Sequence, residues 1–335
     1  MARFTKLRYF YAGAILERKE MRELIESNHA LGDRDALDRI WSEHGYWFFR
    51  DVLDKDAVGA MRDEYLAELR KLDLVDAGSS EPIWNGKPIE NFPATFEDLH
   101  KRRAWQNFVK DPRINAFFEE VLADQIYWIP IDYYRLVAPS KTKDDKAYLG
   151  LHQDGMSNPG IEFVTCWIPL AEIDEHTGGI VIAEGQHQRG YMDVTDGKVG
   201  FSQGPAIPED SWTRAHYQPD DVLIFTKSMP HYGLGNKSAD RFRLSLDIRA
   251  MRRSHPLPVV GKVKTISADE VTVMTEEFGD VTLRLDDYTI VRGPVPGSPN
   301  PMPITRFQAP AELPPGTSVM ATRDDGRALI LRPHL

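Results

Sequence analysis

Two histidines and one aspartate are the residues whose types and spacing best support chemistry. His152 and Asp154 stand two apart in the chain. In an extended segment residues two apart project to the same face, so an imidazole nitrogen and a carboxylate oxygen can reach one metal ion. His-x-Asp alone is a weak motif, because chance produces it often. His231 follows a short apolar strand expected at residues 221–225, and the end of that strand can carry its ring to the same place.

Together these three residues form a recognisable donor set. Two histidines and one carboxylate on one face make the facial triad that holds Fe(II) in non-haem oxygenases and leaves positions open for a bidentate co-substrate and dioxygen. Zinc is the rival metal for the same ligands. The alternative for His231 is a histidine at the edge of the core, bonded to a backbone carbonyl. We interpret His152, Asp154 and His231 as metal ligands and catalytic residues.

A third component lies at residues 241–248, which we expect to form a strand. Its alternation places four polar residues on one face: Arg241, Arg243, Ser245 and Asp247. An arginine directed into a barrel needs an anion, because a buried unpaired guanidinium is costly. Arg243 can hold a carboxylate of a dicarboxylic co-substrate in a two-point contact, with Ser245 donating its hydroxyl to the same group. An ion pair between Arg243 and Asp247 is the alternative, and Arg241 is the second candidate for the anchor.

The elements that must position these residues change in character along the chain. The first 125 residues indicate mainly helix, with apolar spacing of three and four residues at 17–31, 33–44, 54–72 and 115–122, and a short buried strand at 44–49. From residue 126 onward short strands follow one another without helices between them, at 126–136, 163–170, 179–183, 221–225 and 241–248. This pattern predicts an antiparallel barrel or sandwich rather than a parallel α/β sheet.

A second β-rich segment begins after residue 254, where Pro256 and Pro258 flank a change in composition. Strands are expected at 259–265, 270–275, 280–285, 288–291, 318–322 and 328–332, with a proline- and glycine-rich loop at 293–303. We predict an oxygenase-type domain at residues 1–254, with a helical part at 1–125 and a β core at 126–254. A small β-barrel domain of unknown role then occupies residues 255–335, and no catalytic cluster is visible in it.

The composition limits the classes of binding partner and the cellular compartment that we expect. The chain of 335 residues carries a formal net charge of −10 at pH 7, which argues against nucleic-acid or anionic-membrane binding and favours a small polar or cationic molecule. Cys166 is the single cysteine, so no intrachain disulfide can form, which fits a reducing compartment. Residues 1–16 are basic and then briefly apolar, too short a run for a membrane span and a poor signal peptide. We expect a cytoplasmic protein, and the sequence favours no particular oligomeric state.

The motif set resembles that of the phytanoyl-CoA dioxygenase family, which includes ectoine hydroxylase. The resemblance rests on His152-x-Asp154, His231 and Arg243-x-Ser245, in the family's order and spacing. Segments flanking these motifs are similar too, at residues 45–46, 51–53, 165–170, 177–182, 184–187 and 236–238.

Two departures from the family pattern are modest. Ala183 and Glu184 replace the usual apolar residue and proline, and two arginines stand where one is expected. Only Arg243 has the following x-Ser.

The resemblance implies a double-stranded β-helix core, of the jelly-roll or cupin-like kind, wrapped by N-terminal helices. It implies Fe(II), 2-oxoglutarate as co-substrate and O₂. It also places further residues at the co-substrate site or along the strands of its cavity, namely Tyr133, Arg135, Thr165, Trp167 and Gln153. Loop residues near the barrel mouth are candidates for the substrate pocket: Trp84, Asn85, Met156, Ser157 and Asn158.

The reaction implied is oxidation of a small polar metabolite, such as one in specialised-metabolite biosynthesis. Relatives that halogenate replace the triad carboxylate with glycine or alanine, so Asp154 favours hydroxylation, with ring closure or desaturation as variants. Two other classes stay open. A cupin-like metal enzyme without 2-oxoglutarate shares the triad but does not need Arg243-x-Ser245. A non-catalytic small-molecule-binding protein on the same fold is the second.

Overall fold

The computed structural model describes residues 21–90, 92, 96–140, 147–195, 198–201, 207–296 and 298–334. The chain divides into two compact units, which are described separately. The first unit comprises residues 1–89, 135–156 and 166–245, and the second comprises residues 90–134, 157–165 and 246–335. The predicted domain boundary at residue 254 stays a prediction, and the expectation for residues 1–16 lies outside the described residues.

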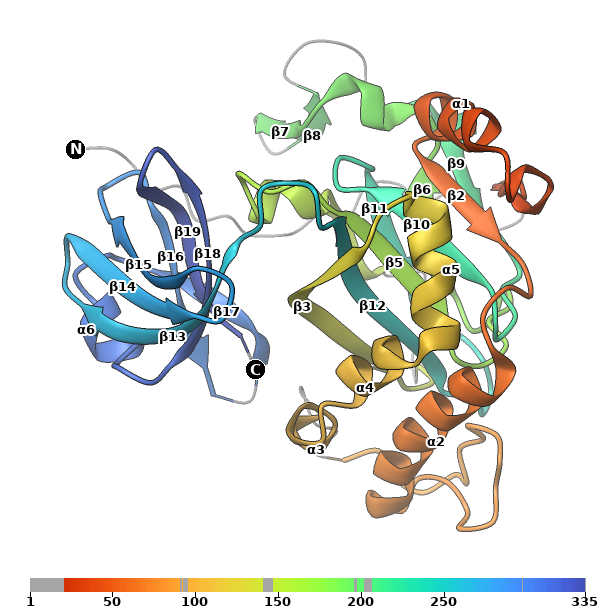
Figure 1. The fold of residues 1–335 in the computed structure, drawn as a ribbon. Helices are drawn as coiled ribbons and strands as arrows, with labels where there is room; N and C mark the ends of the chain where they lie inside the picture. Colours follow the sequence, from red (N-terminus) through yellow and green to blue (C-terminus); the bar gives the residue numbers. More distant parts are fainter. Residues whose placement is uncertain are drawn as a thin grey trace. The chain divides into compact units, whose positions relative to one another are not determined.

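Two helices and a strand lie near the start of the first unit (Figure 1). Helices α1 (Arg34–His44) and α2 (Lys55–Lys71) each begin after an aspartate whose carboxylate accepts a backbone N–H of the first turn. Helix α1 ends at Gly45, whose left-handed conformation (φ 80°) turns the chain into β2 (Tyr46–Phe49). The predicted helices at 33–44 and 54–72 and the predicted strand at 44–49 are therefore confirmed.

The helix predicted at residues 17–31 is wrong in its described part. A short strand β1 (Arg22–Glu23) and a 3-10 turn at Asn28–Ala30 take its place. Strand β1 pairs in parallel with β9 (Trp212–Arg214), and the backbone N–H of Leu24 continues this pairing by donating to Arg214 O at 2.9 Å. Tertiary pairing with a distant segment has overridden the local helical spacing.

Two sheets hold the predicted site strands. One has the order β1-β9-β6-β11-β4, and the other has the order β2-β10-β5-β12-β3. Their bounds are β3 (Ile126–Val137), β4 (Ala147–His152), β5 (Val164–Pro169), β6 (Gly179–Ala183), β10 (Val222–Thr226), β11 (His231–Leu234) and β12 (Arg243–Arg252). Strands β3, β5 and β12 contribute residues to both units. A separate hairpin joins β7 (Met192–Thr195) to β8 (Lys198–Phe201).

The core of the first unit fills the space between strands of these two sheets. Buried side chains from β2, β6 and β10 pack in one cluster: Tyr46, Phe48, Ile180, Ile182, Leu223 and Phe225. Strands β2 and β10 are neighbours in one sheet, and β6 belongs to the other. The prediction of a mainly β fold with N-terminal helices is confirmed.

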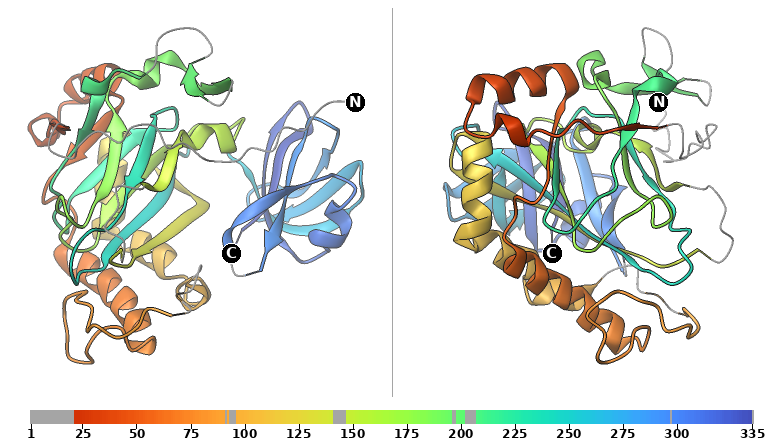
Figure 2. Two further views of the ribbon diagram at one scale, coloured as in Figure 1. Left: turned by 180° about the vertical axis from the view of Figure 1, so that it is seen from behind. Right: turned by 90° about the vertical axis from the view of Figure 1, so that its right-hand side faces the viewer.

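Three α-helices of the second unit precede its seven-stranded sheet in the chain (Figures 1 and 2). The helices are α3 (Glu97–Lys101), α4 (Ala104–Lys110) and α5 (Pro112–Leu122), of which only α5 was predicted, at 115–122. No helix within the described ranges combines the length and the apolar character that a membrane crossing requires.

The sheet of the second unit has seven strands in the order β15-β14-β13-β18-β19-β16-β17. Their bounds are β13 (Val259–Ile266), β14 (Glu270–Thr275), β15 (Gly279–Arg284), β16 (Ile290–Val295), β17 (Ser298–Ile304), β18 (Ser318–Asp324) and β19 (Arg327–Pro333), with helix α6 (Ala309–Glu312) between β17 and β18. Strands β15 and β19 also pair through Arg284 and Arg327. A single residue pair makes this contact, and the small C-terminal barrel stays a prediction.

The loop predicted at residues 293–303 is wrong, because this segment forms the ends of β16 and most of β17. Its prolines suggested a loop, but β17 is an edge strand. An edge strand tolerates proline because its outer N–H positions need no partner in the ladder.

Gly178, just before β6, lies very close to the backbone at the end of β11. Gly178 has φ 100°, and a Cβ at this position would lie 2.7 Å from Gly235 O and 3.0 Å from Leu234 O. Both atoms are backbone, so they cannot move aside as a flexible side chain can. Gly178 is therefore needed for its conformation and for its lack of a side chain.

We predict that Gly178→Ala lowers the thermal unfolding midpoint more than Gly86→Ala does. Gly86 has a similar positive φ of 83° but nothing within 4 Å of its Cβ position. It therefore reports the conformational cost alone, about 1 kcal/mol, whereas Gly178→Ala adds a backbone clash and costs roughly 2–4 kcal/mol. Equal midpoints for the two variants contradict the close approach described for Gly178.

Candidate metal centre and co-substrate site

Antiparallel pairing of β4 and β11 brings the two predicted histidine ligands together in the first unit. His152 and His231 are direct Cα partners in this ladder, and their ring centroids lie 4.1 Å apart. Asp154 follows β4 in a short 3-10 turn, with its Oδ1 atom 3.6 Å from His152 Nε2 and 3.9 Å from His231 Nε2. One ligand atom from each of the three residues lies within 4.8 Å of the others. The structure thus brings together all three residues predicted as metal ligands.

Backbone carbonyls orient both imidazole rings. His152 Nδ1 lies 2.8 Å from Gly150 O, and His231 Nδ1 lies 2.9 Å from Met229 O. A carbonyl oxygen only accepts hydrogen bonds, so each Nδ1 carries the hydrogen and each Nε2 keeps the lone pair that a metal needs. The carbonyl contact considered as an alternative role for His231 is thus present, and it leaves Nε2 available to a metal.

Burial keeps His152 in the protonation state that binds a metal. Burial is the main cause that lowers the pKa of His152 to about 3; the positive charge of His231 adds to it, and the Asp154 carboxylate opposes it. Arg135, on β3, also lowers this pKa through its charge. The His152 ring is therefore neutral at physiological pH, the form that binds metals.

The donor set itself fits a borderline transition metal. Two imidazole nitrogens and one carboxylate oxygen, with His231 only 5% and Asp154 only 8% exposed, suit Fe(II) better than Mg²⁺ or Ca²⁺, which prefer oxygen ligands throughout. Zinc accepts the same donors. The residues present therefore fit an iron centre.

Arg243 begins β12 and is buried among the same strands. Its Nη1 donates to Leu234 O at 2.7 Å and to Gly179 O at 3.4 Å, so it is held at the paired ends of β11 and β6. His231 begins β11 and Leu234 ends it, so the triad and Arg243 lie at opposite ends of one strand, roughly 10 Å apart along its backbone.

The Ser245 side chain is completely buried, and its hydroxyl has no hydrogen-bond partner among the described residues. Its backbone oxygen accepts from Tyr65 Oη at 2.8 Å, which fixes the strand in place. A buried hydroxyl without a partner costs free energy. A carboxylate oxygen beside Arg243 is the kind of acceptor that would satisfy it.

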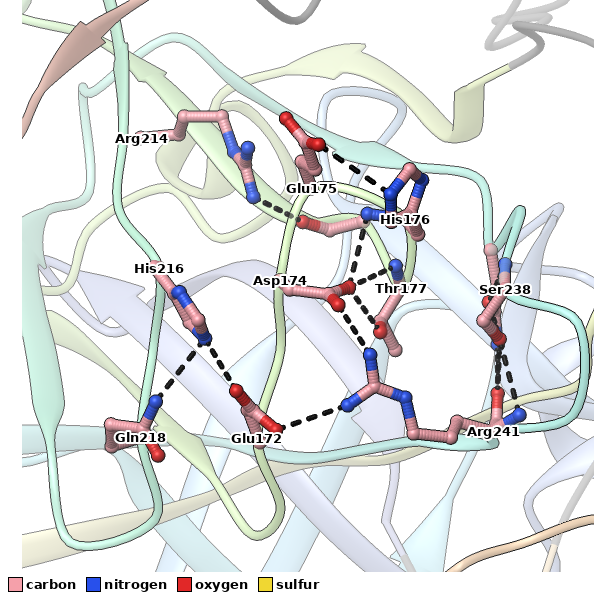
Figure 3. A network of polar contacts seen from close by, with 12 residues as sticks. Glu172, Asp174, Glu175, His176, Thr177, Arg214, His216, Gln218, Ser238 and Arg241 are labelled. Atoms are coloured by element: carbon pink, nitrogen blue, oxygen red, sulfur yellow. Dashed lines mark hydrogen bonds and ion pairs between the residues drawn. The ribbon is translucent and has the colours of Figure 1, made fainter.

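Arg241 pairs with acidic side chains outside the candidate site, as Figure 3 shows. Its guanidinium forms ion pairs with Glu172, at 3.0 Å, and with Asp174. Strand β12 begins at Arg243, so Arg241 lies outside the strand that was expected to begin at residue 241. Of the two candidate arginines, Arg243 is the one placed at the ends of β11 and β6.

The remaining predicted co-substrate residues have other contacts, beginning with Gln153. The Gln153 amide is fully used by the backbone, donating to Gly190 O at 2.8 Å and Ser228 O at 2.5 Å and accepting from Met192 N at 2.6 Å. It therefore ties together the segments around the triad, a role that no side-chain motif signals.

The aromatic and threonine residues of that group lie on the predicted strands. Trp167 belongs to the core cluster and meets Tyr217 edge-on, with ring centroids 4.7 Å apart. Thr165 is buried on β5, and the Tyr133 ring lies 5.2 Å from the Arg249 guanidinium. Co-substrate roles for these residues stay predictions.

The predicted pocket loops show mixed contacts. The Trp84 indole donates to Lys87 O at 2.7 Å and the Asn85 amide donates to Asp73 O at 3.1 Å, whereas Met156 is 37% exposed. Ser157 and Asn158 belong to the second unit, where Ser157 O accepts from Arg292 Nη2 at 3.3 Å and Asn158 Oδ1 accepts from Arg332 Nη1 at 3.1 Å.

Comparison with known proteins agrees with the motif analysis. The sequence model of the family described as phytanoyl-CoA dioxygenase (PhyH) matches residues 41–245. A 1-deoxypentalenic acid 11-beta-hydroxylase of Streptomyces arenae is 30% identical over 65% of this chain and 81% of its own length. Its counterpart in Streptomyces exfoliatus is 28% identical over 68% of this chain and 84% of its own length. A solved structure of EctD from S. alaskensis with bound Fe is 16% identical, with a TM-score of 0.49 over 72% of this chain and 84% of that one.

The chain therefore belongs to the phytanoyl-CoA dioxygenase family, as the resemblance in the sequence indicated. The family is one of Fe(II)- and 2-oxoglutarate-dependent oxygenases, and the three converging ligands of this chain fit its iron.

We predict that Ser245→Ala leaves the free energy of unfolding within about 0.5 kcal/mol of the wild type or raises it, because it removes a buried hydroxyl that has no partner. Ser238→Ala is the matched control. Its hydroxyl is also buried but bonds Asn236 Oδ1 at 2.6 Å and Arg241 O at 2.7 Å. The control should lose about 1–2 kcal/mol in denaturant unfolding. A loss at Ser245 as large as the loss at Ser238 contradicts this account of the hydroxyl.

Proposed function

We propose that this protein is an Fe(II)/2-oxoglutarate-dependent oxygenase that oxidises a small organic metabolite. The observation that carries the proposal is the convergence of His152, Asp154 and His231, with both Nε2 atoms turned toward the carboxylate by backbone contacts at Nδ1. Family membership supports the choice of iron over zinc. As part of this proposal, the two five-stranded sheets that carry the site form a double-stranded β-helix of the jelly-roll kind.

Each residue has a defined part in this proposal. His152, His231 and Asp154 bind the metal, and the carbonyls of Gly150 and Met229 fix the two rings. Arg243 and the Ser245 hydroxyl hold the distal carboxylate of 2-oxoglutarate. Bound iron would couple the decarboxylation of 2-oxoglutarate to oxidation of a substrate C–H bond by O₂. The burial of the ligands limits the access of water.

Hydroxylation is the proposed outcome, with ring closure or desaturation as variants. The two curated relatives are named as hydroxylases of 1-deoxypentalenic acid, which supports hydroxylation and a place in specialised metabolism. The carboxylate of Asp154 supports the same outcome, because it fills the position that halogenating relatives leave to chloride. The proposed substrate class is a small polar metabolite.

The alternatives explain fewer of the residues. A cupin-like metal enzyme without 2-oxoglutarate would use the triad but would leave the Ser245 hydroxyl without a role. A non-catalytic binding protein would need neither the complete donor set nor the neutral imidazole of His152.

We predict that anaerobic addition of Fe(II) and then 2-oxoglutarate produces the weak visible charge-transfer band of the metal chelate. Asp154→Ala should lose the band, because it removes one of three metal ligands. Fe(II) without 2-oxoglutarate is the control and should give no band. Absence of both the band and 2-oxoglutarate-dependent succinate formation in the wild type contradicts the proposed function.

We also predict that Arg243→Ala weakens 2-oxoglutarate binding at least about tenfold, the loss expected when a charge-assisted hydrogen bond is removed. Titration of the anaerobic chelate band measures the affinity. Arg241→Ala is the matched control and should keep the wild-type affinity, because its guanidinium pairs with Glu172 and Asp174. The reverse pattern would move the anchor to Arg241.

A further inference from the structure

The residues on either side of Asp154 both contact one distant segment of the first unit, residues 190–192. Gln153, which precedes Asp154, contributes a side chain that is only 1% exposed. Its amide nitrogen donates to Gly190 O at 2.8 Å, and its amide oxygen accepts from Met192 N at 2.6 Å. One side chain thus bonds to the backbone at both ends of that segment.

The middle residue of the segment, Tyr191, lies against Gly155, which follows Asp154 in the chain. A Cβ atom at Gly155 would lie 2.2 Å from Tyr191 Oη and 2.9 Å from two of the ring carbons. The φ of Gly155 lies outside the left-handed region, so its backbone conformation does not require glycine. The close approach of the Tyr191 ring is therefore what excludes a larger residue here.

A second set of contacts links the same turn to the segment before His231. The Gln153 amide nitrogen also donates to Ser228 O at 2.5 Å, and Gly155 N donates to Lys227 O at 2.9 Å. These two carbonyls belong to the residues three and four positions before His231. The turn is thereby connected to the chain that leads into the strand of the second histidine.

Asp154 depends on such contacts more than the two histidines do. His152 and His231 are partners in the ladder between β4 and β11, whereas Asp154 lies in a 3-10 turn of four residues after β4. The ladder therefore does not fix the direction of its carboxylate. Contacts that fix a ligand before the metal arrives reduce the conformational entropy lost on binding.

We propose that residues 190–192 act as a clamp on the turn that carries Asp154. Gln153 and Tyr191 are then positioning residues for this metal ligand. Gln153 acts through its backbone contacts, and Tyr191 acts through its packing against Gly155. The inference rests on the proposed function, because it takes Asp154 as a ligand of the iron.

A clamp that only stabilises the fold predicts a different behaviour. Its loss would lower the free energy of unfolding and leave the metal affinity of the folded protein unchanged. Loss of a contact that orients a ligand instead weakens metal binding by the folded protein, typically about 10–100-fold. Tyr191 is 43% exposed, so shortening its side chain leaves the buried core intact.

The test measures Fe(II) binding to the full chain by anaerobic calorimetry, without 2-oxoglutarate and below the unfolding midpoint of every variant. Leaving out 2-oxoglutarate excludes a direct contact with the co-substrate as the cause of a loss. The variants are Gln153→Met, of similar length, and Tyr191→Ala. The controls are Gln188→Met, an exposed glutamine that donates to Ser42 O at 2.7 Å, and Tyr288→Ala, at an 83% exposed position.

We expect Gln153→Met to weaken Fe(II) binding about 10–100-fold and Tyr191→Ala to weaken it about tenfold, because each removes contacts that orient the carboxylate. Tyr191→Phe should recover most of the affinity lost in Tyr191→Ala, because it keeps the ring against Gly155. Both controls should bind Fe(II) as the wild type does, since Gln188 bonds elsewhere and Tyr288 belongs to the second unit.

A double-mutant cycle tests the contact itself. Gly155→Ala places a methyl group where the Tyr191 ring lies, so it should displace the ring and weaken Fe(II) binding as Tyr191→Ala does. In the double variant the methyl group has room, and we expect no loss beyond that of Tyr191→Ala alone. Losses that add would show that the two residues act independently.

The outcomes separate this proposal from the proposed function. If the wild type binds Fe(II), and Gln153→Met and Tyr191→Ala bind it equally well, the clamp is only structural and the proposal fails alone. If the wild type does not bind Fe(II), the proposed function fails and the clamp fails with it. If Gln153→Met does not fold, the cycle between Gly155 and Tyr191 decides, and additive losses overturn the proposal.

Discussion

The register between β4 and β11 is the constraint on which the candidate site depends. It sets His152 directly opposite His231. Side chains alternate between the two faces of a sheet, so a slip of one residue would turn one ring to the opposite face and separate the two nitrogens. Asp154 then needs only the short turn after β4 to reach both rings. The three donors are therefore positioned by strand pairing and one turn, with no long loop involved.

Strand β11 also connects the proposed metal ligands to the proposed co-substrate anchor. Strand β11 begins with His231 and ends at Leu234, whose carbonyl accepts from Arg243. Carbonyls of Gly150 and Met229 fix the histidine tautomers from the adjoining backbone. Because backbone carbonyls hold both histidine rings and Arg243, sheet pairing determines the geometry of the site more than neighbouring side chains do. This is the preorganisation that a metal site requires before the metal binds.

Residue type and local spacing were enough to predict the parts of the site that lie on one strand or one turn. Alternation along the predicted strand indicates Ser245 in this way, and the structure buries its side chain on β12. The backbone role of Gln153 could not be predicted, because its partners are main-chain atoms up to 75 residues away. The contact between Asn158 and Arg332 spans 174 residues and has no motif. The segment at 293–303 was misread because proline marks loops and edge strands alike.

An iron-loaded crystal gives the most direct test of the central claim. Anomalous scattering measured on both sides of the iron absorption edge would locate the metal without reference to activity. The account predicts one iron site, bonded to Nε2 of His152, Nε2 of His231 and a carboxylate oxygen of Asp154. Iron bound away from these three residues, or bound through either Nδ1 atom, would contradict it.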